Sequence, residues 1–437
     1  MKIIHFADAH VDSVTSGKVD PKTGLPLRVL DFLKSIDKIV DTSIEEKADL
    51  VIFSGDAFKD RMPSPTYQRE WLKRIFRLSE AKIPTLMITG NHDVSPASGR
   101  ANTLFEFDTL AVPFVRVSSK PEFLKPADLW NLPVQILTVP WINSSLFIEK
   151  SGDKIDKSRI GEEIEDRVTN VLEHWLDELD PQLPSILVAH CSVMGAVFST
   201  ERKVMIGKDM VLPGWIVKDK RLDYVALGHI HKYQDLNEGN HPPVIYPGSI
   251  ERLDFGEIND QKGFIVASIE KGSTTYEHRA LEVRPFIEAE FIFDKKGKVL
   301  LNGDEIAPAG QGRETETVIS GIQCRWNTAD SIFKIVVNYP KEMEENFNER
   351  EIHSKFNNVF EFHFVKKPIY EERLRLANTT AEELMAKSPL ELLLMYFSVK
   401  GSPEDFDTVK DLAIDIIGTV DQQEKVYSGG SDDGSKL

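Results

Sequence analysis

The sequence predicts an α/β protein that is built from more than one domain. Short apolar segments rich in Val and Ile recur along the first half of the chain, and segments with helical periodicity lie between them. After about residue 280, apolar and polar residues alternate, which is typical of strands buried on one face. The chain has 437 residues, more than the ~250 to 300 at which one hydrophobic core stops growing. We therefore expect an α/β domain, a smaller α+β domain and C-terminal helices.

The composition predicts a globular protein of the cytoplasm. Apolar residues make up 41% of the chain and charged residues 28%, no apolar run approaches the ~18 residues of a membrane span, and no signal peptide precedes the first strand. Cys191 and Cys324 are too few for a disulfide framework, and a reducing compartment suits both. The net charge of −17 argues against a general nucleic-acid coat. Any DNA would be bound through a local patch, metal ions or a partner.

Three apolar segments in the first hundred residues end in side chains that can bind a metal ion. The segments and the residues that follow them are 2–6 with Asp8 and His10, 49–53 with Asp56, and 85–89 with Asn91, His92 and Asp93. Polar residues just after the C-terminal ends of strands are where α/β sheets place their sites. The three segments therefore predict strands whose ends form part of a site.

Two later segments end in the same way. They are 185–189, followed by His190, and 224–227, followed by His229 and His231. Before them, apolar residues recur at helical spacing over 160–179, which predicts an amphipathic helix. The alternation of strands and helices thus continues to about residue 230.

The residues at these strand ends are carboxylates, imidazoles and an amide. Each has an ordinary structural explanation by itself, since an Asp after a Gly is often a turn or a helix cap. Five of the eleven histidines nevertheless fall at these strand ends, which no structural rule demands. The mixed ligand types suit Mn, Fe or Zn better than Ca. A carboxylate that bridges two such ions, ~3.5 to 4 Å apart, creates a centre for phosphoester hydrolysis.

The ordered set of motifs resembles the calcineurin-like metallophosphoesterases. The motifs are Asp8-x-His10, Gly55-Asp56, Gly90-Asn91-His92-Asp93, His190 and Gly228-His229-x-His231. The runs HCSVMGA from His190 and YPGSIERLDFGE from Tyr246 are also similar to the SbcD branch of this family, the nuclease subunits of a double-strand-break repair complex. The resemblance covers most of the chain and implies a β-sandwich flanked by helices.

The resemblance also implies a role for each residue at the strand ends. The expected ligands of two divalent ions, most simply Mn, are Asp8, His10, Asp56 and His231 for one ion and Asp56, Asn91, His190 and His229 for the other. Asp56 would bridge the two ions. His92 would face the scissile phosphate and stabilise the transition state or protonate the leaving oxygen. Asp93 would brace the turn, and a direct catalytic role is the alternative.

Position 59 departs from the pattern of the family. In relatives, the third residue after the bridging Asp is commonly an Asp or a His that orients the catalytic imidazole, whereas here it is Lys59. A charged lysine cannot accept the imidazole proton. Either Asp60 takes the orienting role, or Lys59 contacts the phosphate and stabilises its growing negative charge. A purely solvated Lys59 is the third alternative.

The chain is expected to divide into a nuclease domain, 1–280, and a second domain, 281–370. Alternating residues around 287–293, 333–337 and 360–364 predict strands of a sheet covered on one face, and the segment from Lys341 to Asn357 predicts the covering helix. The resemblance implies that this domain caps the catalytic domain and guides DNA toward the metals. A continuation of the sandwich is the alternative.

The C-terminal segment, 371–427, predicts short helices, and 428–437 predicts a flexible tail. Capping-box patterns at 380–383, 388–391 and 402–405 mark helix starts. The last two helices have more apolar surface than short helices can leave exposed. The resemblance implies that they dock onto an SbcC-type, SMC-like ATPase, and folding back onto the catalytic domain is the alternative.

The leading hypothesis is a Mn-dependent DNA exonuclease and endonuclease subunit that acts in DNA repair with this ATPase. A phosphomonoesterase or phosphoprotein phosphatase would share every metal ligand and stays an alternative, as does a non-catalytic scaffold subunit. The resemblance further implies a homodimer through helices of the catalytic domain. No membrane partner is expected.

Overall fold

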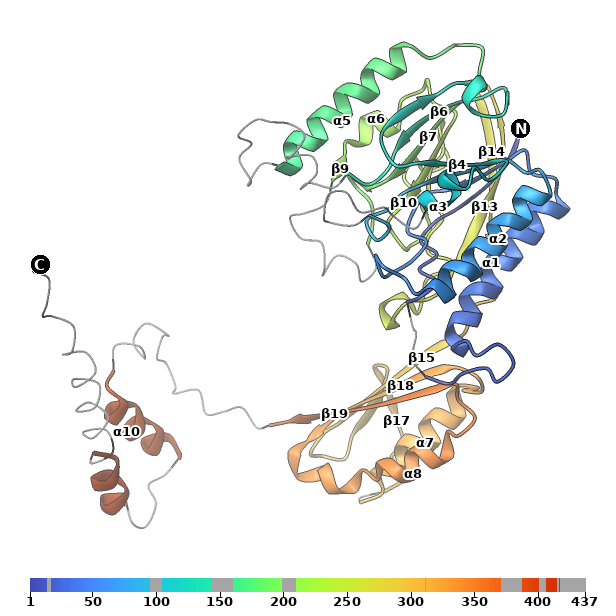
Figure 1. Ribbon diagram of the computed structural model, residues 1–437. Helices are drawn as coiled ribbons and strands as arrows, with labels where there is room; N and C mark the ends of the chain where they lie inside the picture. The colour runs from blue at the N-terminus through green and yellow to red at the C-terminus, as the bar shows by residue number, and fades with distance from the viewer. Residues whose placement is uncertain are drawn as a thin grey trace, which may run out of the picture. The chain divides into compact units, whose positions relative to one another are not determined.

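The protein is described by a computed structural model (Figure 1). The residues that it describes are 1–13, 17–94, 104–142, 160–198, 210–310, 312–370, 387–400, 406–414 and 416. The chain divides into two compact units. Unit 1 contains Met1–Glu288, Asn327–Lys334 and Phe356–His363, and unit 2 contains Ala289–Trp326, Ile335–Lys355 and Phe364–Leu437. The domain boundaries at 280 and 370 stay a prediction.

One six-stranded sheet of unit 1 contains the first strands of the chain. Its order is β14 (Ser273–Ala280), β13 (Gly263–Glu270), β1 (Lys2–Phe6), β2 (Leu50–Phe53), β3 (Thr85–Ile88) and β4 (Val115–Ser118). The strands from β1 to β4 are parallel, and β13 and β14 join antiparallel at one side. The carboxyl ends of β1, β2 and β3 therefore meet at one edge of the sheet.

A second six-stranded sheet lies against the first. Its order is β11 (Gln234–Asp235), β12 (Val244–Tyr246), β10 (Tyr224–Gly228), β7 (Ser185–His190), β6 (Gln135–Val139) and β5 (Glu122–Leu124). Its four central strands are parallel and its edge strands antiparallel. All five apolar segments expected from the sequence are thus strands. A short pair, β8 (Ser192–Val193) and β9 (Val211–Leu212), follows β7 in the chain.

Three clusters of buried side chains hold unit 1 together. One lies between the two sheets and includes Ile3 and Ile186, both fully buried. The other two lie on the outer faces of the sheets, under helices. These helices are α1 (Leu27–Glu45) and α2 (Pro65–Glu80) on the first sheet, and α5 (Ile160–Asp177) and α6 (Gly214–Val217) on the second. Because the central strands are buried on both faces, they are mostly apolar, with a few buried polar residues such as His5 in β1. The predicted β-sandwich flanked by helices is confirmed.

The second half of the chain contains a five-stranded sheet. Its order is β17 (Asp304–Ile306), β16 (Val299–Leu301), β15 (Phe286–Phe293), β18 (Ile332–Pro340) and β19 (Glu361–Ile369). The three strands that the alternating pattern predicted are β15, β18 and β19. The hairpin of β16 and β17 was not expected, although Asn302 and Gly303, with φ of 50° and 89°, form the Asn-Gly turn that such hairpins favour.

The helical part of unit 2 differs from the expectation of one helix from Lys341 to Asn357. A 3₁₀ helix, Lys341–Asn346, and a short α8, Glu349–Lys355, take its place. Phe347 interrupts the helix because its ring packs against Phe293 and Tyr339, at centroid distances of 5.2 and 4.7 Å. The longer helix is α7 (Glu314–Arg325). Its Thr and Val residues and Gly321 have low helix propensity, so the sequence did not predict it.

Two helical segments are described near the C-terminus. Helix α10 (Pro389–Lys400) begins at the predicted capping box, since the Ser388 hydroxyl accepts from the Glu391 amide and the Glu391 carboxylate accepts from the Ser388 amide. Residues 406–414 are also helical. The capping boxes at 380–383 and 402–405 and the tail 428–437 lie outside the described residues.

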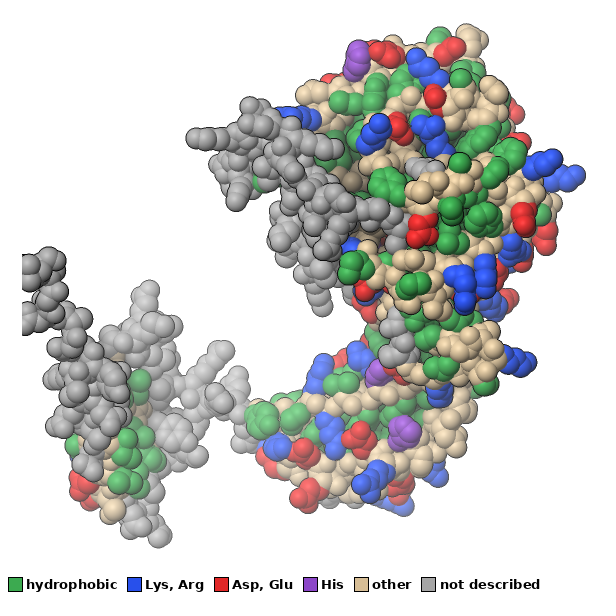
Figure 2. All heavy atoms as spheres, in the orientation of Figure 1, with side chains coloured by type: hydrophobic (Ala, Val, Ile, Leu, Met, Phe, Trp, Pro, Cys, Tyr) green, Lys and Arg blue, Asp and Glu red, His purple; other side chains and the backbone are tan. Residues whose placement is uncertain are grey.

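Among the described residues, no helix combines the length and the apolar character that crossing a membrane requires. The cytoplasmic location stays a prediction. On the face of the described residues drawn in Figure 2, Lys and Arg side chains are interspersed with Asp and Glu. Charges of both signs are thus mixed on this face of the described residues.

His5, in the middle of β1, should make the stability of the metal-free chain depend on pH. Burial lowers its pKa to about 3 from 6.5, and its ring nitrogens lie 3.0 Å from the Tyr224 hydroxyl and 2.9 Å from that of Ser54. The unfolded chain therefore binds a proton that the folded chain does not, and stability is lost as the pH falls from 6.5 toward 3.

The expected loss from this one group is about 1.4 kcal/mol per pH unit. His5→Gln should be less stable at neutral pH but should lack this part of the slope. Urea unfolding of chelator-treated wild type and variant, between about pH 7 and pH 4.5, measures the difference. Equal slopes for the two chains would contradict the prediction.

Candidate metal centre

The loops after β1 and β2 hold their candidate ligands side by side. The Asp8 amide donates to the Gly55 carbonyl (3.0 Å), and the His10 amide donates to the Asp56 carbonyl (3.2 Å). Asp8, His10 and Asp56 have φ of 51°, 40° and 62°, in the left-handed region that residues other than glycine rarely adopt. Backbone strain of this kind persists where the surrounding structure enforces it, and it is common at functional sites.

The second sheet brings further candidates to the same place. Strands β7 and β10 are parallel neighbours, with Gly228 opposite His190. The His229 amide donates to both oxygens of the Asp8 carboxylate, at 3.0 and 3.1 Å. This contact joins residues that are 221 positions apart and connects the strand ends of the two sheets.

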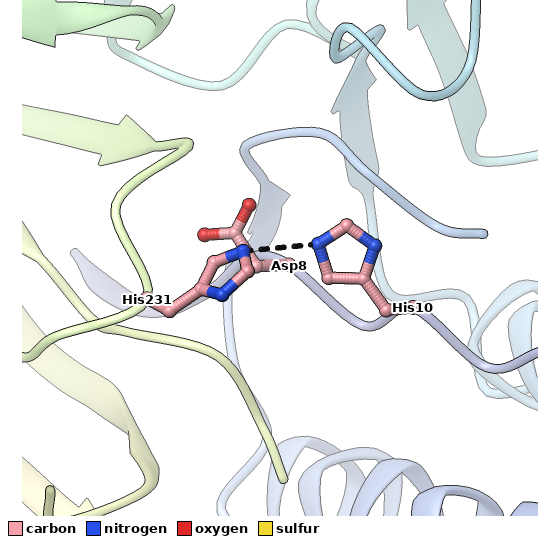
Figure 3. A group of neighbouring side chains, drawn as sticks. All are labelled: Asp8, His10 and His231. Carbon is pink, nitrogen blue, oxygen red and sulfur yellow. Dashed lines mark hydrogen bonds between the residues drawn. The ribbon is translucent and has the colours of Figure 1, made fainter. Parts of the chain in front are cut away.

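Asp8, His10 and His231 form one group that could hold a metal ion (Figure 3). Each offers one ligand atom, and these atoms lie within 4.8 Å of one another. The Nε2 atoms of His10 and His231 face each other at 3.1 Å. Asp8 and His10 are buried, and only 12% of the His231 side chain is exposed.

The second group surrounds Asp56 and Asn91. Asp8, Asp56 and His190 offer ligand atoms within 4.8 Å of one another. The Asn91 side-chain oxygen lies 3.1 Å from His190 Nε2 and 3.1 Å from His229 Nδ1. Asp56 Oδ2 is 3.5 Å from His190 Nε2 and 3.7 Å from His10 Nε2, so Asp56 lies between the two groups.

Hydrogen bonds behind two of the rings determine which nitrogen faces the site. His190 Nδ1 donates to the Ser54 carbonyl (2.6 Å), and His231 Nδ1 lies 2.9 Å from the Glu257 carboxylate. Both partners are acceptors, so each Nδ1 carries a hydrogen and each Nε2 presents its lone pair to the site in the neutral ring. Ligand histidines in metal sites are fixed in this way.

Burial and charge shift the pKa values of these groups strongly. Burial would raise the pKa of Asp56, but the neighbouring His190 and further imidazoles hold it well below its usual range. Burial would lower the pKa of His190, but the Asp56 carboxylate outweighs it and raises that pKa to about 9. Burial raises the pKa of Asp8. A cation bound here would take the place of protons.

These residues fit a pair of divalent ions. Two neutral imidazole nitrogens at 3.1 Å need a proton or a cation between them, and buried carboxylates need a positive partner. The mixed oxygen and nitrogen donors are those that Mn, Fe or Zn prefer. All the sequence-predicted ligands are brought together, and the Asp56 carboxylate lies between His10 and His190.

Gly90 is required by the close approach of two strand ends. A Cβ at this position would lie 2.1 Å from Asp56 Oδ1 and 2.6 Å from the Asp56 amide nitrogen, far inside van der Waals contact. A Cβ at Gly55, which has φ of 98°, would likewise lie too close to His190 Nδ1, at 2.4 Å. Glycine lets the backbone carry the ligands this near to one another.

His92 lies beside the ligands but is held differently. Its Nδ1 is 2.7 Å from the main-chain carbonyl of Lys59, and its ring centroid is 5.2 Å from that of His10. Because a carbonyl only accepts, Nδ1 carries a hydrogen and Nε2 is the remaining nitrogen. The His92 side chain is half-buried, whereas the candidate ligands Asp8, Asp56 and His190 are almost wholly buried.

The neighbours of His92 clarify the departure at position 59. The group at Nδ1 is the main-chain carbonyl of Lys59, which a residue of any type would offer. The predicted alternatives for position 59 concerned side chains only. The Asp60 carboxylate accepts from the Met62 amide (3.0 Å). Asp93 accepts from the amides of Asp56, Ala57 and Gly90 and so braces the turn. Burial lowers the pKa of His10 well below its usual value, and the Lys59 ammonium adds to this lowering.

Sequence reasoning missed three residues near the site. Asp12 accepts from the Lys59 amide (2.6 Å), and the Trp141 ring lies 5.4 Å from that of His229. Glu257 contacts His231 and is 1% exposed. Glu257 stands in the run YPGSIERLDFGE that carries part of the resemblance, and a carboxylate in such a run was the available signal.

Comparison with known proteins agrees with this geometry. A model of the calcineurin-like phosphoesterase family matches residues 1–233. A curated relative, the SbcD subunit of the nuclease SbcCD from Staphylococcus epidermidis, is 28% identical over 296 residues, which are 67% of this chain and 72% of the relative.

Two solved structures are similar over part of the chain. A dimetal phosphatase from Danio rerio has a TM-score of 0.38 and 11% identity, and it covers 64% of this chain and 96% of its own. A protein of Thermus thermophilus has a TM-score of 0.32 and 15% identity, and it covers 63% of this chain and 98% of its own.

The family match spans more than half of the chain and includes every candidate ligand from Asp8 to His231. Two sheets place these ligands in one buried group that fits divalent ions. The protein therefore belongs to the calcineurin-like phosphoesterase family and is a metal-dependent hydrolase of phosphoesters.

Proposed function

We propose that this protein is a nuclease subunit that hydrolyses phosphodiester bonds of DNA, with two divalent ions, Mn being the expected metal. The convergence of the buried carboxylates and imidazoles carries the proposal. The similarity to a relative that is named as a nuclease subunit supports a nucleic-acid substrate and a role in DNA repair. Exonuclease and endonuclease activity both belong to the proposal.

The chain would hold the two ions with ligands from both sheets. The proposed sets are Asp8, His10, Asp56 and His231 for one ion, and Asp56, Asn91, His190 and His229 for the other. Bound divalent ions supply charge neutralisation for the phosphate and lower the pKa of a nearby water. The protein supplies fixed positions, because most ligands follow buried strands and are held by backbone hydrogen bonds.

His92 is the proposed catalytic residue. Its Nδ1 hydrogen is held by the Lys59 carbonyl, which leaves Nε2 as the atom that exchanges a proton or donates a hydrogen bond. Its half-exposed side chain can meet a substrate that the buried ligands cannot reach directly. Lys59 is proposed as a phosphate contact, with Asp60 as the alternative orienting group.

A phosphomonoesterase or phosphoprotein phosphatase would use the same ligands. The second unit, with its own buried side chains such as Phe291 and Val337, goes beyond what a metal centre requires and supports a larger substrate such as DNA. The capping role of this unit is part of the proposal. A scaffold without activity would not need the complete ligand set.

One assay separates these functions. The purified chain with Mn is offered linear duplex DNA, a nitrophenyl monoester and a phosphopeptide, and hydrolysis of each is measured. Cleavage of DNA in clear preference to the other two substrates is expected. Preferred hydrolysis of the monoester or the phosphopeptide would indicate a phosphatase instead of a nuclease. No hydrolysis of any of the three substrates would support a non-catalytic scaffold subunit.

The C-terminal helices are the proposed docking site for an SbcC-type, SMC-like ATPase. In the described part of these helices, Phe397 packs against Phe406 (5.6 Å), and Leu412, Ile414 and Ile416 are 45 to 59% exposed. Exposed apolar side chains in a row of short helices favour a protein partner. A homodimer through helices of unit 1 is also proposed, and light scattering of the purified chain tests it.

Deleting residues 380–437 should separate catalysis from partner binding. Mn-dependent cleavage of short or single-stranded DNA should persist, because every proposed ligand precedes residue 232. ATP-dependent processing and co-purification with the ATPase should be lost. The full-length chain is the control, and a truncated chain that still binds the ATPase with unchanged stoichiometry would rule out this docking site.

Asp56→Ala and His92→Ala should fail in different ways. Asp56→Ala should lose Mn and activity together, since one carboxylate lies between both metal groups. His92→Ala should keep its Mn but lose about a hundredfold or more in turnover, the typical share of a proton-transfer group. Metal content by mass spectrometry and turnover are measured on the same samples. Equal metal loss in both variants would show that the roles are assigned wrongly.

Lys59→Ala tests the phosphate contact without disturbing His92, because the main-chain carbonyl that holds Nδ1 remains. If the ammonium stabilises the transition state, turnover should fall roughly ten- to a thousandfold. Asp60→Asn serves as the matched neighbour and should change little, since its contact is with Met62. Turnover at saturating Mn measures both. A larger loss in Asp60→Asn would assign the orienting role to Asp60 instead.

A further inference from the structure

A buried ion pair lies directly behind His231. Glu257 ends the 3₁₀ helix Phe255–Glu257, and Lys262 immediately precedes β13. Each of the two residues is only 1% exposed, and their charged ends lie 2.9 Å apart. Neither residue belongs to the proposed ligand set or to the proposed catalytic group.

Both oxygens of the Glu257 carboxylate have partners. Oε1 lies 2.9 Å from His231 Nδ1, and Oε2 accepts from the Leu253 amide (2.9 Å) and from the Lys262 ammonium (2.9 Å). The carboxylate is thereby held on one side by the backbone and by a cation, and on the other side it holds the imidazole. The His231 ring cannot rotate without breaking this bond.

The Lys262 ammonium holds His231 a second time. Its three hydrogen-bond acceptors are the Glu257 carboxylate, the Ser249 hydroxyl (2.9 Å) and the main-chain carbonyl of His231 (3.0 Å), and the Asp260 carboxylate lies 3.7 Å away. An ammonium group has three hydrogens, and three acceptors are present. Both ends of His231, its ring and its backbone, are thus connected to one buried pair.

Stability alone gives no reason for this arrangement. A buried ion pair of this kind is often matched or exceeded in stability by apolar side chains of similar volume, because both charges lose their hydration. A carboxylate behind a ligand imidazole, in contrast, fixes the tautomer and the ring orientation and makes the ligand more basic. The second effect explains why the pair is placed against His231.

We propose that Glu257 and Lys262 are positioning residues, which hold His231 with Nε2 toward Asp8 and His10 and so set the affinity of the metal ion that these three would bind. The inference rests on the two-metal centre proposed above and adds a specific determinant of one of its two sites. Figure 3 shows the atom that is positioned, since one ring nitrogen of His231 faces His10.

The test measures binding of Mn²⁺ alone to the metal-free, full-length chain by titration calorimetry. Wild type should bind two ions per chain. Glu257→Gln should bind one ion with wild-type affinity and the other about 10- to 100-fold more weakly, the usual effect of removing such an outer partner. Urea unfolding of the metal-free proteins measures stability separately.

Glu251→Gln is the matched control. Glu251 is also 1% exposed and is paired with a buried cation, Arg28, at 3.2 Å, but Arg28 and Arg252 are its contacts instead of a proposed ligand. This variant should lose stability without any change in Mn affinity. An equal loss of Mn affinity in Glu251→Gln would overturn the inference.

The double variant Glu257→Gln/Lys262→Met distinguishes an effect on the position of His231 from an effect on stability. It also replaces Glu257→Gln in the test if that single variant does not fold. With both charges removed, stability should recover part of the way toward wild type, since the Asp260 carboxylate also loses the ammonium 3.7 Å away, while one Mn affinity stays reduced. Recovery of stability and affinity together would mean that the pair is structural only, and unchanged affinity in Glu257→Gln would also overturn the proposal. A wild-type chain that binds no Mn would instead refute the metal centre itself.

Discussion

Buried carboxylates and imidazole nitrogens that face one another need positive charge among them, and the rest of the site depends on this requirement. Asp56 lies within 3.7 Å of Nε2 of both His10 and His190, in a region almost without solvent. In the metal-free chain, the Asp56 carboxylate raises the pKa of His190 to about 9, which favours the protonated imidazole. Divalent ions would satisfy the requirement better, because each can accept several of these donors at once.

The fold meets this requirement by bringing two sheets together at their strand ends. A single sheet could align Asp8 and Asp56, but the imidazoles of His190, His229 and His231 come from the opposite sheet. The approach is close enough that Gly90 has no room for a Cβ, and four candidate ligands, Asp8, His10, Asp56 and His229, have positive φ. Packing between the sheets offsets this local strain.

Around these groups, the structure fixes proton positions by acceptors behind the rings. Carbonyl oxygens hold His190 and His92, whereas a carboxylate backed by Lys262 holds His231. A carboxylate increases the basicity of the imidazole more than a carbonyl does. The two candidate ligand groups therefore differ in the partners behind their imidazoles although their ligand types are similar.

The sequence by itself determined the strands β1, β2, β3, β7 and β10, because each is buried on both faces and its residues are therefore mostly apolar. The sequence also shows the types of candidate ligand that follow these strands. Helix α7 and the β16–β17 hairpin were not predicted, since Gly321 and Asn302-Gly303 act through packing and turn geometry that no periodicity shows.

Only the tertiary structure decided which groups touch. The carbonyl of Lys59 at His92, and Glu257 at His231, are contacts between segments 26 to 33 residues apart whose backbone path no local pattern predicts. A main-chain carbonyl is present at every position, so its role cannot be encoded by residue type. The sequence thus determined the chemistry that is available, and the packing of two sheets decided its geometry, because distances between distant segments depend on the whole core.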